Sequence, residues 1–328
     1  MLITIGIVAL NEEEYLPLLL KDIQNQDYCH NQIEIIIADG GSTDNTIEII
    51  NLFKKNNPDF YNIKILQNIN KIQASGWNLV IDNAQGETIT RIDAHSSIPS
   101  DFISKNIKVI QSGEMVCGGI RPNIILGETN WKRTLLSFEK SIFGSGSASY
   151  RRSLEKMYVK SVFHGTYRKE VFEKAGKFNE KLLRTEDNEM HYRINEAGYR
   201  ICYDPSISSY QYARSNFWKM LKQKYSNGYW IGITQKICPK CLSLFHFVPL
   251  LFTVAIFLCT FISLILGSPF LILLLIVVYL IAAILATIQV FCNDGFNWTN
   301  ITLPLIFFIM HIGYGIGTVR GLLSFNKK

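Results

Sequence analysis

Two long uncharged stretches toward the end of the chain constrain its fold more than any other feature. The run from about Leu244 to Leu266 is apolar for 23 positions, with His246 and Pro249 near its start, and the run from about Phe270 to Cys292 is equally long. A helix of roughly 20 residues is enough to cross the hydrocarbon of a bilayer. Helices of a soluble core seldom run so far without charge, so we interpret both runs as transmembrane helices joined by a tight hairpin.

A third apolar run, from Ile301 to about Leu323, is less uniform. It contains Pro304, His311, Arg320 and four glycines. A third full crossing would place the tail Lys327–Lys328 on the side opposite the soluble part, whereas the positive-inside rule prefers the same side. The pattern leaves three arrangements open for this run: a span, a re-entrant segment and an interfacial helix.

Charged residues divide the chain more informatively than the net charge of +6 does. The first 240 residues hold 30 of the 33 Lys and Arg side chains and 26 of the 27 Asp and Glu side chains. We therefore predict a soluble domain over residues 1–240 and a membrane domain over residues 241–328. The chain opens on a strand-like run rather than an export signal, and its seven cysteines suit a reducing compartment. These features predict a multi-pass protein of the cytoplasmic (inner) membrane whose soluble domain faces the cytoplasm.

The first 120 residues alternate between apolar strand-like runs and amphipathic helical runs. This alternation predicts right-handed βαβ units and a mainly parallel sheet. Asn11, followed by three glutamates, resembles the cap of the first helix. We expect strands at Ile3–Leu10, Ile33–Ala38, Ile63–Gln67 and Thr88–Ile92, and further helices at Asp44–Lys55 and Lys71–Asn83.

Polar residues gather where these strands end. Asn11 follows the first strand, Asp39 follows the second, and Asp93 and His95 follow the fourth. Ligands of open α/β sheets bind beyond the carboxyl ends of the strands, so we expect these side chains to converge. Turn chemistry alone is an alternative explanation of the Asp39-Gly40-Gly41-Ser42 sequence.

Asp93 and His95 are two residues apart, so on extended backbone they face the same way. Asp93 could bind Mg²⁺ or Mn²⁺, and His95 could bind metal or phosphate. A divalent ion there would neutralise a diphosphate. Manganese accepts imidazole more readily than magnesium does.

A second constellation runs from Thr185 to Arg193. Thr185 resembles a helix cap, and Glu186 and Asp187 fall in the first turn, where the helix dipole favours their charge. A well-capped acidic helix start is the structural interpretation. The functional interpretation makes Asp187, with Glu186 beside it, a base that accepts the proton of a hydroxyl group.

Four motifs follow one another along the chain: Ile7–Glu12, Ala38–Asp44, Arg91–His95, and Thr185–Asp187 leading to Ala197–Arg200. Together they resemble the family 2 glycosyltransferases of the GT-A fold. With the stretches His164–Arg168 and Met310–Gly315, the chain is similar over nearly its whole length to the branch of the succinoglycan-biosynthesis glucosyltransferases.

The resemblance implies an inverting transfer of a sugar from a nucleotide-sugar, expected to be a UDP-hexose, to a lipid-diphosphate-linked saccharide in exopolysaccharide or capsule biosynthesis. It implies that Asp187 is the base, that Mg²⁺ or Mn²⁺ is the cofactor, and that Asp93 and His95 stand where the family's Asp-x-Asp motif binds metal. Because histidine replaces the second aspartate, Asp93 becomes the main ligand. The residues that it implies for nucleotide-sugar binding are Asn11, Glu12, Asp39, Gly40 and Asp93.

The segment of about residues 214–230 carries Phe217, Trp218, Leu221 and Tyr225 at helical spacing, with lysines around it. We interpret it as an interfacial helix on anionic lipid, with an ordinary packing helix as the alternative. It offers no counterpart of the processive synthases' Gln-x-x-Arg-Trp motif, which favours single-sugar addition.

A lipid-diphosphate acceptor could also meet basic residues such as Arg151, Arg152 and Arg168. No nucleic-acid partner is expected. The alternatives are a polyprenyl-phosphate sugar synthase and an inactive membrane protein that binds sugar nucleotides. A dinucleotide-dependent oxidoreductase is disfavoured because no Gly-x-Gly-x-x-Gly follows the first strand.

Overall fold

The structure, a computed structural model, describes residues 1–145, 153–214 and 216–324, and the chain forms two compact units. Unit 1 consists of Met1–Pro122 and Tyr150–Tyr212, and unit 2 consists of Asn123–Ser149 and Ala213–Lys328. The charge-based division at residue 240 does not coincide with these units. Two charged helices, α5 (Asn130–Lys140) and α8 (Phe217–Ile237), pack with the apolar helices that follow them in sequence.

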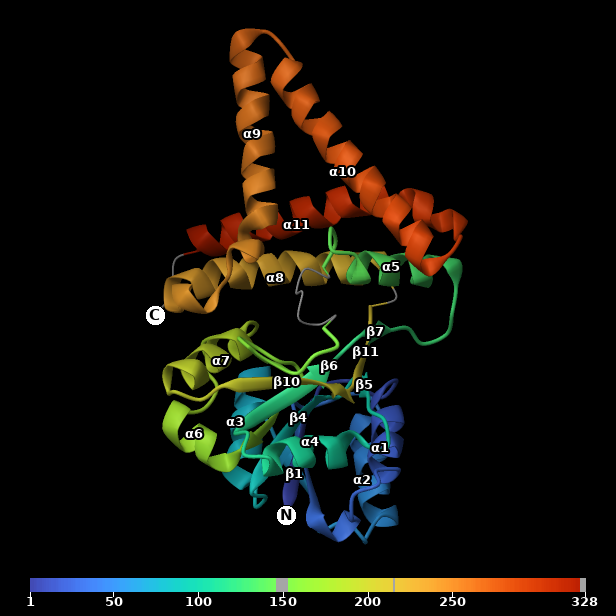
Figure 1. The fold of residues 1–328 in the computed structure, drawn as a ribbon, viewed down its shortest axis with the longest axis vertical. Coiled ribbons are helices and arrows are strands. Elements are labelled where there is room, and N and C mark those ends of the chain that lie inside the picture. Colours follow the sequence, from blue (N-terminus) through green and yellow to red (C-terminus); the bar gives the residue numbers. More distant parts are fainter. Residues whose placement is uncertain (146–152, 215, 325–328) are drawn as a thin grey trace. The chain divides into compact units, whose positions relative to one another are not determined.

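Unit 1 is built on an eight-stranded sheet in the order β3-β2-β1-β4-β9-β6-β10-β8 (Figure 1). The first four strands of this order are parallel, and β9 pairs antiparallel with both β4 and β6. The strands are β1 (Ile3–Ala9), β2 (Ile33–Asp39), β3 (Asn62–Gln67), β4 (Thr88–Asp93), β6 (Val116–Ile120), β8 (Met157–Val159), β9 (Thr166–Arg168) and β10 (Ile201–Ser208).

The four predicted strands are confirmed to within one residue at each end. Every residue of β2 is buried, and β1 is buried except at Val8. Parallel strands covered on both faces read as near-continuous apolar runs, which is why their sequence identified them.

Helices cover both faces of this sheet. The isoleucines of β1 pack against α1 (Leu16–Gln24), α2 (Thr46–Asn56) and α4 (Phe102–Gln111) in one apolar cluster. On the other face, Trp77 and Val80 of α3 (Gln73–Asn83) pack with α6 (Lys169–Ala175) and α7 (Glu186–Glu196). Each fully buried Leu, Ile or Phe contributes roughly 1.5–3 kcal/mol of transfer free energy. Such burial holds the strands in place, and with them the loops that follow their carboxyl ends.

The prediction that Asn11 caps the first helix is wrong. Helix α1 begins at Leu16 with Tyr15 at the N-cap position, and Pro17 lies in its first turn. Asn11 instead adopts left-handed backbone, with φ of 54°, a conformation that Asn tolerates better than most residues. Its side chain is therefore free to serve the loop that follows β2.

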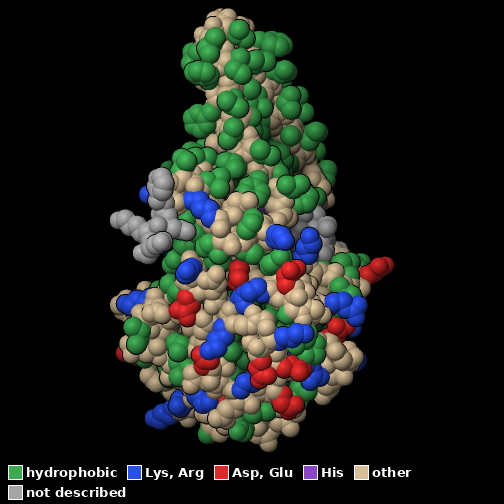
Figure 2. Space-filling view, turned by 90° about the vertical axis from the view of Figure 1, so that its left-hand side faces the viewer, with side chains coloured by type: hydrophobic (Ala, Val, Ile, Leu, Met, Phe, Trp, Pro, Cys, Tyr) green, Lys and Arg blue, Asp and Glu red, His purple; other side chains and the backbone are tan. Residues whose placement is uncertain are grey.

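Among the residues of unit 2 that the structure describes, three helices are long and apolar enough to cross a membrane: Leu244–Leu266, Phe270–Asp294 and Trp298–Leu323. The first two correspond to the two uncharged runs. Their regular α-helices are α9 (Val248–Leu266) and α10 (Phe270–Asp294), and the connecting Gly267 has φ of 64°. Figure 2 shows hydrophobic side chains over this hairpin. The third contains α11 (Leu303–Leu323).

Helices α8 and α11 lie along each other at backbone distance (Figure 1). A Cβ added to Gly317 would lie 2.2 Å from the Tyr225 carbonyl oxygen, and one added to Gly321 would lie 2.1 Å from that of Tyr229. Small residues at four-residue spacing allow such close approach, and membrane helices use them for association. Gly317 and Gly321 are therefore a packing surface for α8.

The predicted interfacial helix is confirmed as a helix, though it runs over Phe217–Ile237 and one of its lysines does not face outward. Lys224 is 8% exposed, and its Nζ lies 2.7 Å from the Glu139 carboxylate of α5 and 2.6 Å from Ser145 Oγ. Lys219 and Lys222 are exposed. Packing therefore occupies part of the surface that the pattern assigned to lipid.

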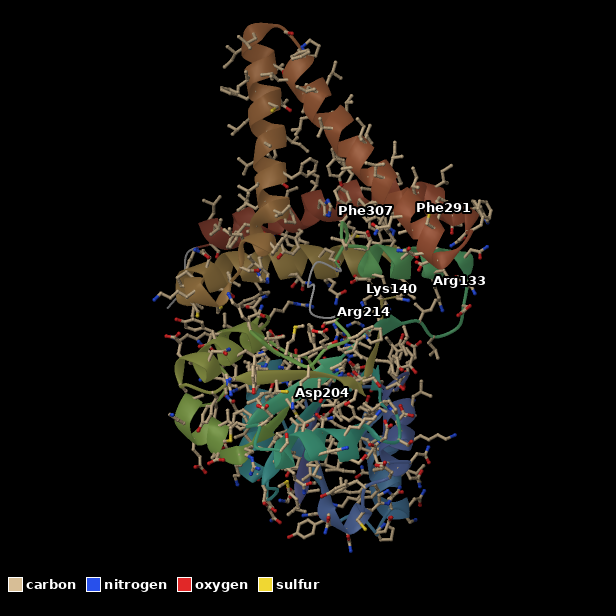
Figure 3. All side chains as sticks on the ribbon, in the orientation of Figure 1. Arg133, Lys140, Asp204, Arg214, Phe291 and Phe307 are labelled. Atoms are coloured by element: carbon tan, nitrogen blue, oxygen red, sulfur yellow. The ribbon has the colours of Figure 1, made fainter. Side chains whose placement is uncertain are left out.

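Polar contacts join α5 to the segment between α10 and α11, and an aromatic contact joins it to α11 itself. The Thr134 hydroxyl donates to Asn300 Oδ1 at 2.7 Å, and Asn297 Nδ2 donates to the Asn130 carbonyl at 2.9 Å. Phe307 of α11, labelled in Figure 3, packs on Phe138 with ring centroids 5.6 Å apart.

The remaining short elements are β5 (Ser96–Ser97) and β11 (Tyr210–Tyr212), which pair with each other, β7 (Asn123–Ile124), and single 3₁₀ turns at His30–Gln32, Pro239–Cys241, Leu244–Phe247 and Trp298–Thr302.

Candidate active site

The loops after β1 and β2 are joined by hydrogen bonds. Asn11 Oδ1 accepts from the Thr43 amide at 2.8 Å, and the Asn11 amide donates to Ser42 Oγ at 2.9 Å. The Glu12 amide donates to Thr46 Oγ1 at 2.8 Å. These contacts give both loops one fixed conformation at the carboxyl edge of the sheet, where ligands bind in such folds.

Asp39 uses both carboxylate oxygens inside its own turn. Oδ2 accepts from the amides of Gly41 and Ser42 at 2.8 and 3.0 Å, and Oδ1 accepts from Ser42 Oγ at 2.6 Å. Gly41 has φ of 82°, a conformation that glycine adopts without strain. The turn interpretation therefore accounts for Asp39. A Cβ added to Gly40 would lie 3.4 Å from Leu10 Cδ1, an ordinary van der Waals contact, so packing does not require glycine at this position.

Asp93, the last residue of β4, has few strong partners among the described residues. Oδ1 accepts one long hydrogen bond, 3.3 Å from Gln73 Nε2, while Arg91 Nη2 lies 3.8 Å from Oδ1 and His164 Nε2 lies 3.7 Å from Oδ2. Burial opposes its ionisation, but the imidazole of His164 and the charge of Arg91 hold the pKa of Asp93 well below its usual range. The carboxylate is ionised and retains lone pairs for a ligand.

His95 stands between two partners in the turn after β4. Its Nδ1 lies 3.1 Å from Glu12 Oε1, and its Nε2 lies 2.9 Å from Gln211 Nε2 of β11. The His95 carbonyl also accepts from the Tyr212 amide. The structure thus places Glu12, which was expected to bind the nucleotide-sugar, in contact with His95.

Arg91 joins the two predicted constellations. Its guanidinium Nη2 donates to Glu186 Oε1 at 3.2 Å, on the same side chain that lies 3.8 Å from Asp93. The Arg91 Cζ lies 4.8 Å from the centroid of the Trp77 ring and 5.6 Å from that of Phe178. A guanidinium held between ring faces is well suited to a buried ion pair. The end of β4 and the start of α7 therefore belong to one cluster.

Glu186 and Asp187 differ in their surroundings. Glu186 is 3% exposed, whereas Asp187 is half-buried and accepts from the Asn188 amide at 2.8 Å. Burial, followed by the charge of Asp187, raises the pKa of Glu186 to about 7, although Arg91 acts in the opposite direction. Asp187 is thus the more accessible carboxylate.

Thr185 occupies the N-cap position as expected, but its backbone is left-handed, with φ of 65°, and its hydroxyl donates to the Arg184 carbonyl. The expected side-chain cap of α7 is therefore wrong, because this backbone directs the hydroxyl elsewhere.

No chemical role was predicted for His164, which is buried and has φ of 20°. Its ring nitrogens contact Ser96 Oγ at 3.1 Å and Ser209 Oγ at 2.9 Å. Burial lowers the pKa of His164, so the ring is neutral beside Asp93. Both His164 and Arg91 stood within motifs that the sequence presented, but Gln211 carried no signal.

Of the three basic residues expected to meet phosphate, the structure describes Arg168, whose hydrogen bond lies outside this cluster. Arg168 Nη2 donates to the Ile110 carbonyl at 3.1 Å. Arg151 and Arg152 lie outside the described residues.

The donor set can be tested for a divalent metal. Within residues 1–145, 153–214 and 216–324, no three His, Cys, Asp or Glu side chains form a metal-binding group. The Asp93 carboxylate, which accepts one long hydrogen bond, and the His95 imidazole offer two ligands of suitable type. Sites that share a metal with substrate phosphates supply few ligands from the protein. These residues fit such a shared ion.

A family model described as glycosyl transferase family 2 matches residues 4–176. The dolichyl N-acetyl-alpha-D-glucosaminyl phosphate 3-beta-D-2,3-diacetamido-2,3-dideoxy-beta-D-glucuronosyltransferase of Methanococcus voltae is 30% identical over 331 residues, which cover 99% of this chain and 98% of that protein. The succinoglycan biosynthesis protein ExoA of Rhizobium meliloti is 26% identical over 228 residues, which cover 68% of this chain and 67% of that protein.

Among solved structures, the mannosyltransferase PcManGT from Pyrobaculum calidifontis, in complex with GDP-Man and Mn²⁺, has a TM-score of 0.58 at 14% identity, covering 97% of this chain and 86% of that one. Residues 1–349 of S. aureus TarS in complex with UDP-GlcNAc have a TM-score of 0.51 at 16% identity, covering 68% of this chain and 66% of that one. At these identities the likeness concerns the fold, which is GT-A.

Proposed function

The chain belongs to glycosyl transferase family 2, and we propose that it moves a sugar from a nucleotide diphosphate to a lipid-linked saccharide with inversion. The observation that carries the proposal is the contact from Asp93 through Arg91 to Glu186. It links the ionised carboxylate of Asp93, suited to a diphosphate-bound metal, to the start of α7, where the half-buried Asp187 follows Glu186 and is suited to an acceptor hydroxyl.

Each residue then has a chemical task. Asp187 accepts the proton of the acceptor hydroxyl as that oxygen attacks the anomeric carbon, and the bond to the diphosphate breaks. Glu186 and Arg91 form the buried support that fixes the start of α7. A divalent metal, Mn²⁺ or Mg²⁺, would be held by Asp93 with His95 and would stabilise the charge of the leaving diphosphate.

The names of the relatives narrow the proposed substrates. One relative is named for a dolichyl N-acetylglucosaminyl phosphate acceptor and another for succinoglycan biosynthesis. We take a saccharide linked through phosphate or diphosphate to a polyprenol as the acceptor class, in the assembly of a cell-surface polysaccharide or glycan. UDP-linked hexoses and their N-acetylated and uronic acid derivatives are the donor class. The proposed location is the cytoplasmic membrane, with the active site facing the cytoplasm.

The experiment is a transfer assay with the full-length protein in membranes. Radiolabelled UDP-sugars are combined with three acceptors: polyprenyl-diphosphate-saccharide, polyprenyl-phosphate-saccharide and bare polyprenyl phosphate. We expect labelled lipid with a saccharide-bearing acceptor. Label transferred to bare polyprenyl phosphate alone would overturn the proposal in favour of a polyprenyl-phosphate sugar synthase, the activity named for a relative that matches 37% of this chain.

Two variants test the division of roles. Asp187→Asn removes the base, so we expect transfer to fall by about 100- to 10,000-fold while calorimetry shows unchanged binding of the donor. Glu186→Gln resembles the protonated carboxyl and should retain most activity. Equal losses in the two variants, or wild-type turnover by Asp187→Asn, would remove the base assignment.

A further inference from the structure

Glu12 and His95 form a carboxylate–imidazole pair, and Gln211 donates a hydrogen bond to the other ring nitrogen of His95. We propose that Glu12 positions His95 as the second protein ligand of the divalent metal, and that the Gln211 amide occupies the ligating nitrogen of His95 until the metal displaces it. The inference rests on the proposed function and assigns to Glu12 a role other than nucleoside binding.

The hydrogen-bond chemistry fixes which ring nitrogen faces the metal. The amide nitrogen of Gln211 only donates hydrogen bonds, so its 2.9 Å contact makes His95 Nε2 an acceptor. In the neutral ring the proton then lies on Nδ1, which donates to Glu12 Oε1 at 3.1 Å. A neutral imidazole with a free lone pair on Nε2 is the form that binds metals.

A carboxylate on the opposite nitrogen is the usual companion of a metal-bound histidine. It fixes the ring orientation and the tautomer, and it makes the ligating nitrogen more basic. Here the Glu12 side chain is 17% exposed and that of His95 is 22% exposed. The Glu12 backbone is held by Thr46 Oγ1 at 2.8 Å, so the carboxylate approaches His95 from a fixed loop.

Gln211 reaches His95 from a different part of unit 1. It lies in β11 and pairs with Ser96 of β5, the residue next to His95. Its amide is a neutral donor, which a cation can displace at lower cost than a competing charge. The arrangement keeps the histidine tautomer defined before the metal arrives.

The pair explains how the site manages without a second aspartate at position 95. An imidazole contributes no negative charge to the metal, but the Glu12 carboxylate, hydrogen-bonded to the far side of the ring, supplies that charge close by. Because imidazole ligands favour manganese over magnesium, the site should prefer Mn²⁺.

The experiment measures Mn²⁺ binding to the purified full-length protein with UDP present, by electron paramagnetic resonance. We expect Glu12→Gln to weaken Mn²⁺ binding by about 10- to 100-fold. Electron spin echo modulation from a coordinated ¹⁴N should be present in the wild type and absent in His95→Asp. Gln211→Ala should bind Mn²⁺ at least as tightly as the wild type.

Two controls separate positioning from a general disturbance of the loop. Glu13→Gln alters the neighbouring carboxylate, which accepts from Asn45 at 2.8 Å, and should leave Mn²⁺ affinity unchanged. In the His95→Asp background, Glu12→Gln should have no further effect, because there is no imidazole to orient.

Wild-type affinity in Glu12→Gln, or equal weakening with and without His95, would overturn the inference. So would ¹⁴N modulation that persists in His95→Asp. Any of these results leaves the transfer assay untouched, so the failure of the inference is distinct from failure of the proposed function.

Discussion

The guanidinium of Arg91 lies 3.2 Å from the carboxylate of Glu186, at the junction of β4 and α7. Their side chains are 11% and 4% exposed. Three carboxylates, those of Asp93, Glu186 and Asp187, act on this one cation, and together they raise the pKa of Arg91 despite its burial. Arg91 is thus the cation that these three carboxylates share, so we expect the stability of this cluster to depend on it.

Replacing Arg91 tests this dependence. Arg91→Met leaves the buried Glu186 without a cation, and removal of one partner of a buried pair costs about 3–5 kcal/mol. We expect a lower unfolding temperature and loss of transfer activity. Arg91→Lys keeps the charge but loses the planar contact with Trp77, so its unfolding temperature should lie between those of the wild type and Arg91→Met.

The double variant Arg91→Met/Glu186→Gln is the control. Because it removes the unpaired charge as well, it should recover part of the lost stability. Unfolding of Arg91→Met at the wild-type temperature would contradict the assignment.

Glu186 makes the stability of this region depend on pH. Burial, then the charge of Asp187, raises its pKa from the ordinary value of 4.5 to about 7 in the folded chain. Between these values the native state binds a proton that the unfolded state has released. Stability is therefore greatest below the lower value and falls as the pH rises through the upper one. Glu186→Gln removes this dependence.

Hydrogen exchange of α7 measures the effect locally. Raising the pH from about 5 to about 8 should reduce protection of α7 more in the wild type than in Glu186→Gln, after correction for intrinsic exchange rates. A parallel response in the two proteins would mean that Glu186 does not titrate in this range and would contradict the raised pKa.

The central strands and the place of the site could be predicted from the sequence because each rests on local signals. Apolar runs such as Ile33–Ala38 mark strands buried on both faces, and Asp93 ends such a run. The topology of parallel strands then determines which loops meet.

Other features depend on contacts between distant residues, which no local pattern encodes. Gln211 reaches His95 across 116 positions, and Lys224 pairs with Glu139 across 85. The turn at Asp39 is local by contrast, and turn chemistry was one of its two sequence interpretations: its oxygens accept hydrogen bonds from Gly41 and Ser42, and its contact with a nucleoside stays a prediction. The glycines of the third apolar run indicated close packing in hindsight, but their spacing does not identify α8 as the partner.

The Lys224–Glu139 pair gives a prediction for unit 2. Lys224→Met leaves the Glu139 carboxylate, whose side chain is 12% exposed, without its cation at 2.7 Å. We expect a destabilisation of about 3–5 kcal/mol, seen as a lower melting temperature in detergent. Lys224→Met/Glu139→Leu should recover most of it, and Lys222→Met, at an exposed position, should change little. A stable Lys224→Met protein would return this lysine to the lipid-facing role.

Gly317 and Gly313 of α11 form a matched pair for the packing on α8. A Cβ at Gly317 would lie 2.2 Å from the backbone oxygen of Tyr225, which cannot move without shifting α8, whereas one at Gly313 would meet the flexible end of Leu221 at 2.7 Å. Overpacking against backbone costs about 1–3 kcal/mol, and the gain in helix propensity from Gly to Ala, about 1 kcal/mol, is common to both. We therefore expect Gly317→Ala to lower the melting temperature in detergent, and Gly313→Ala to leave it unchanged or raise it. Equal melting temperatures for the two variants would mean that α8 and α11 do not pack at backbone distance in the membrane protein.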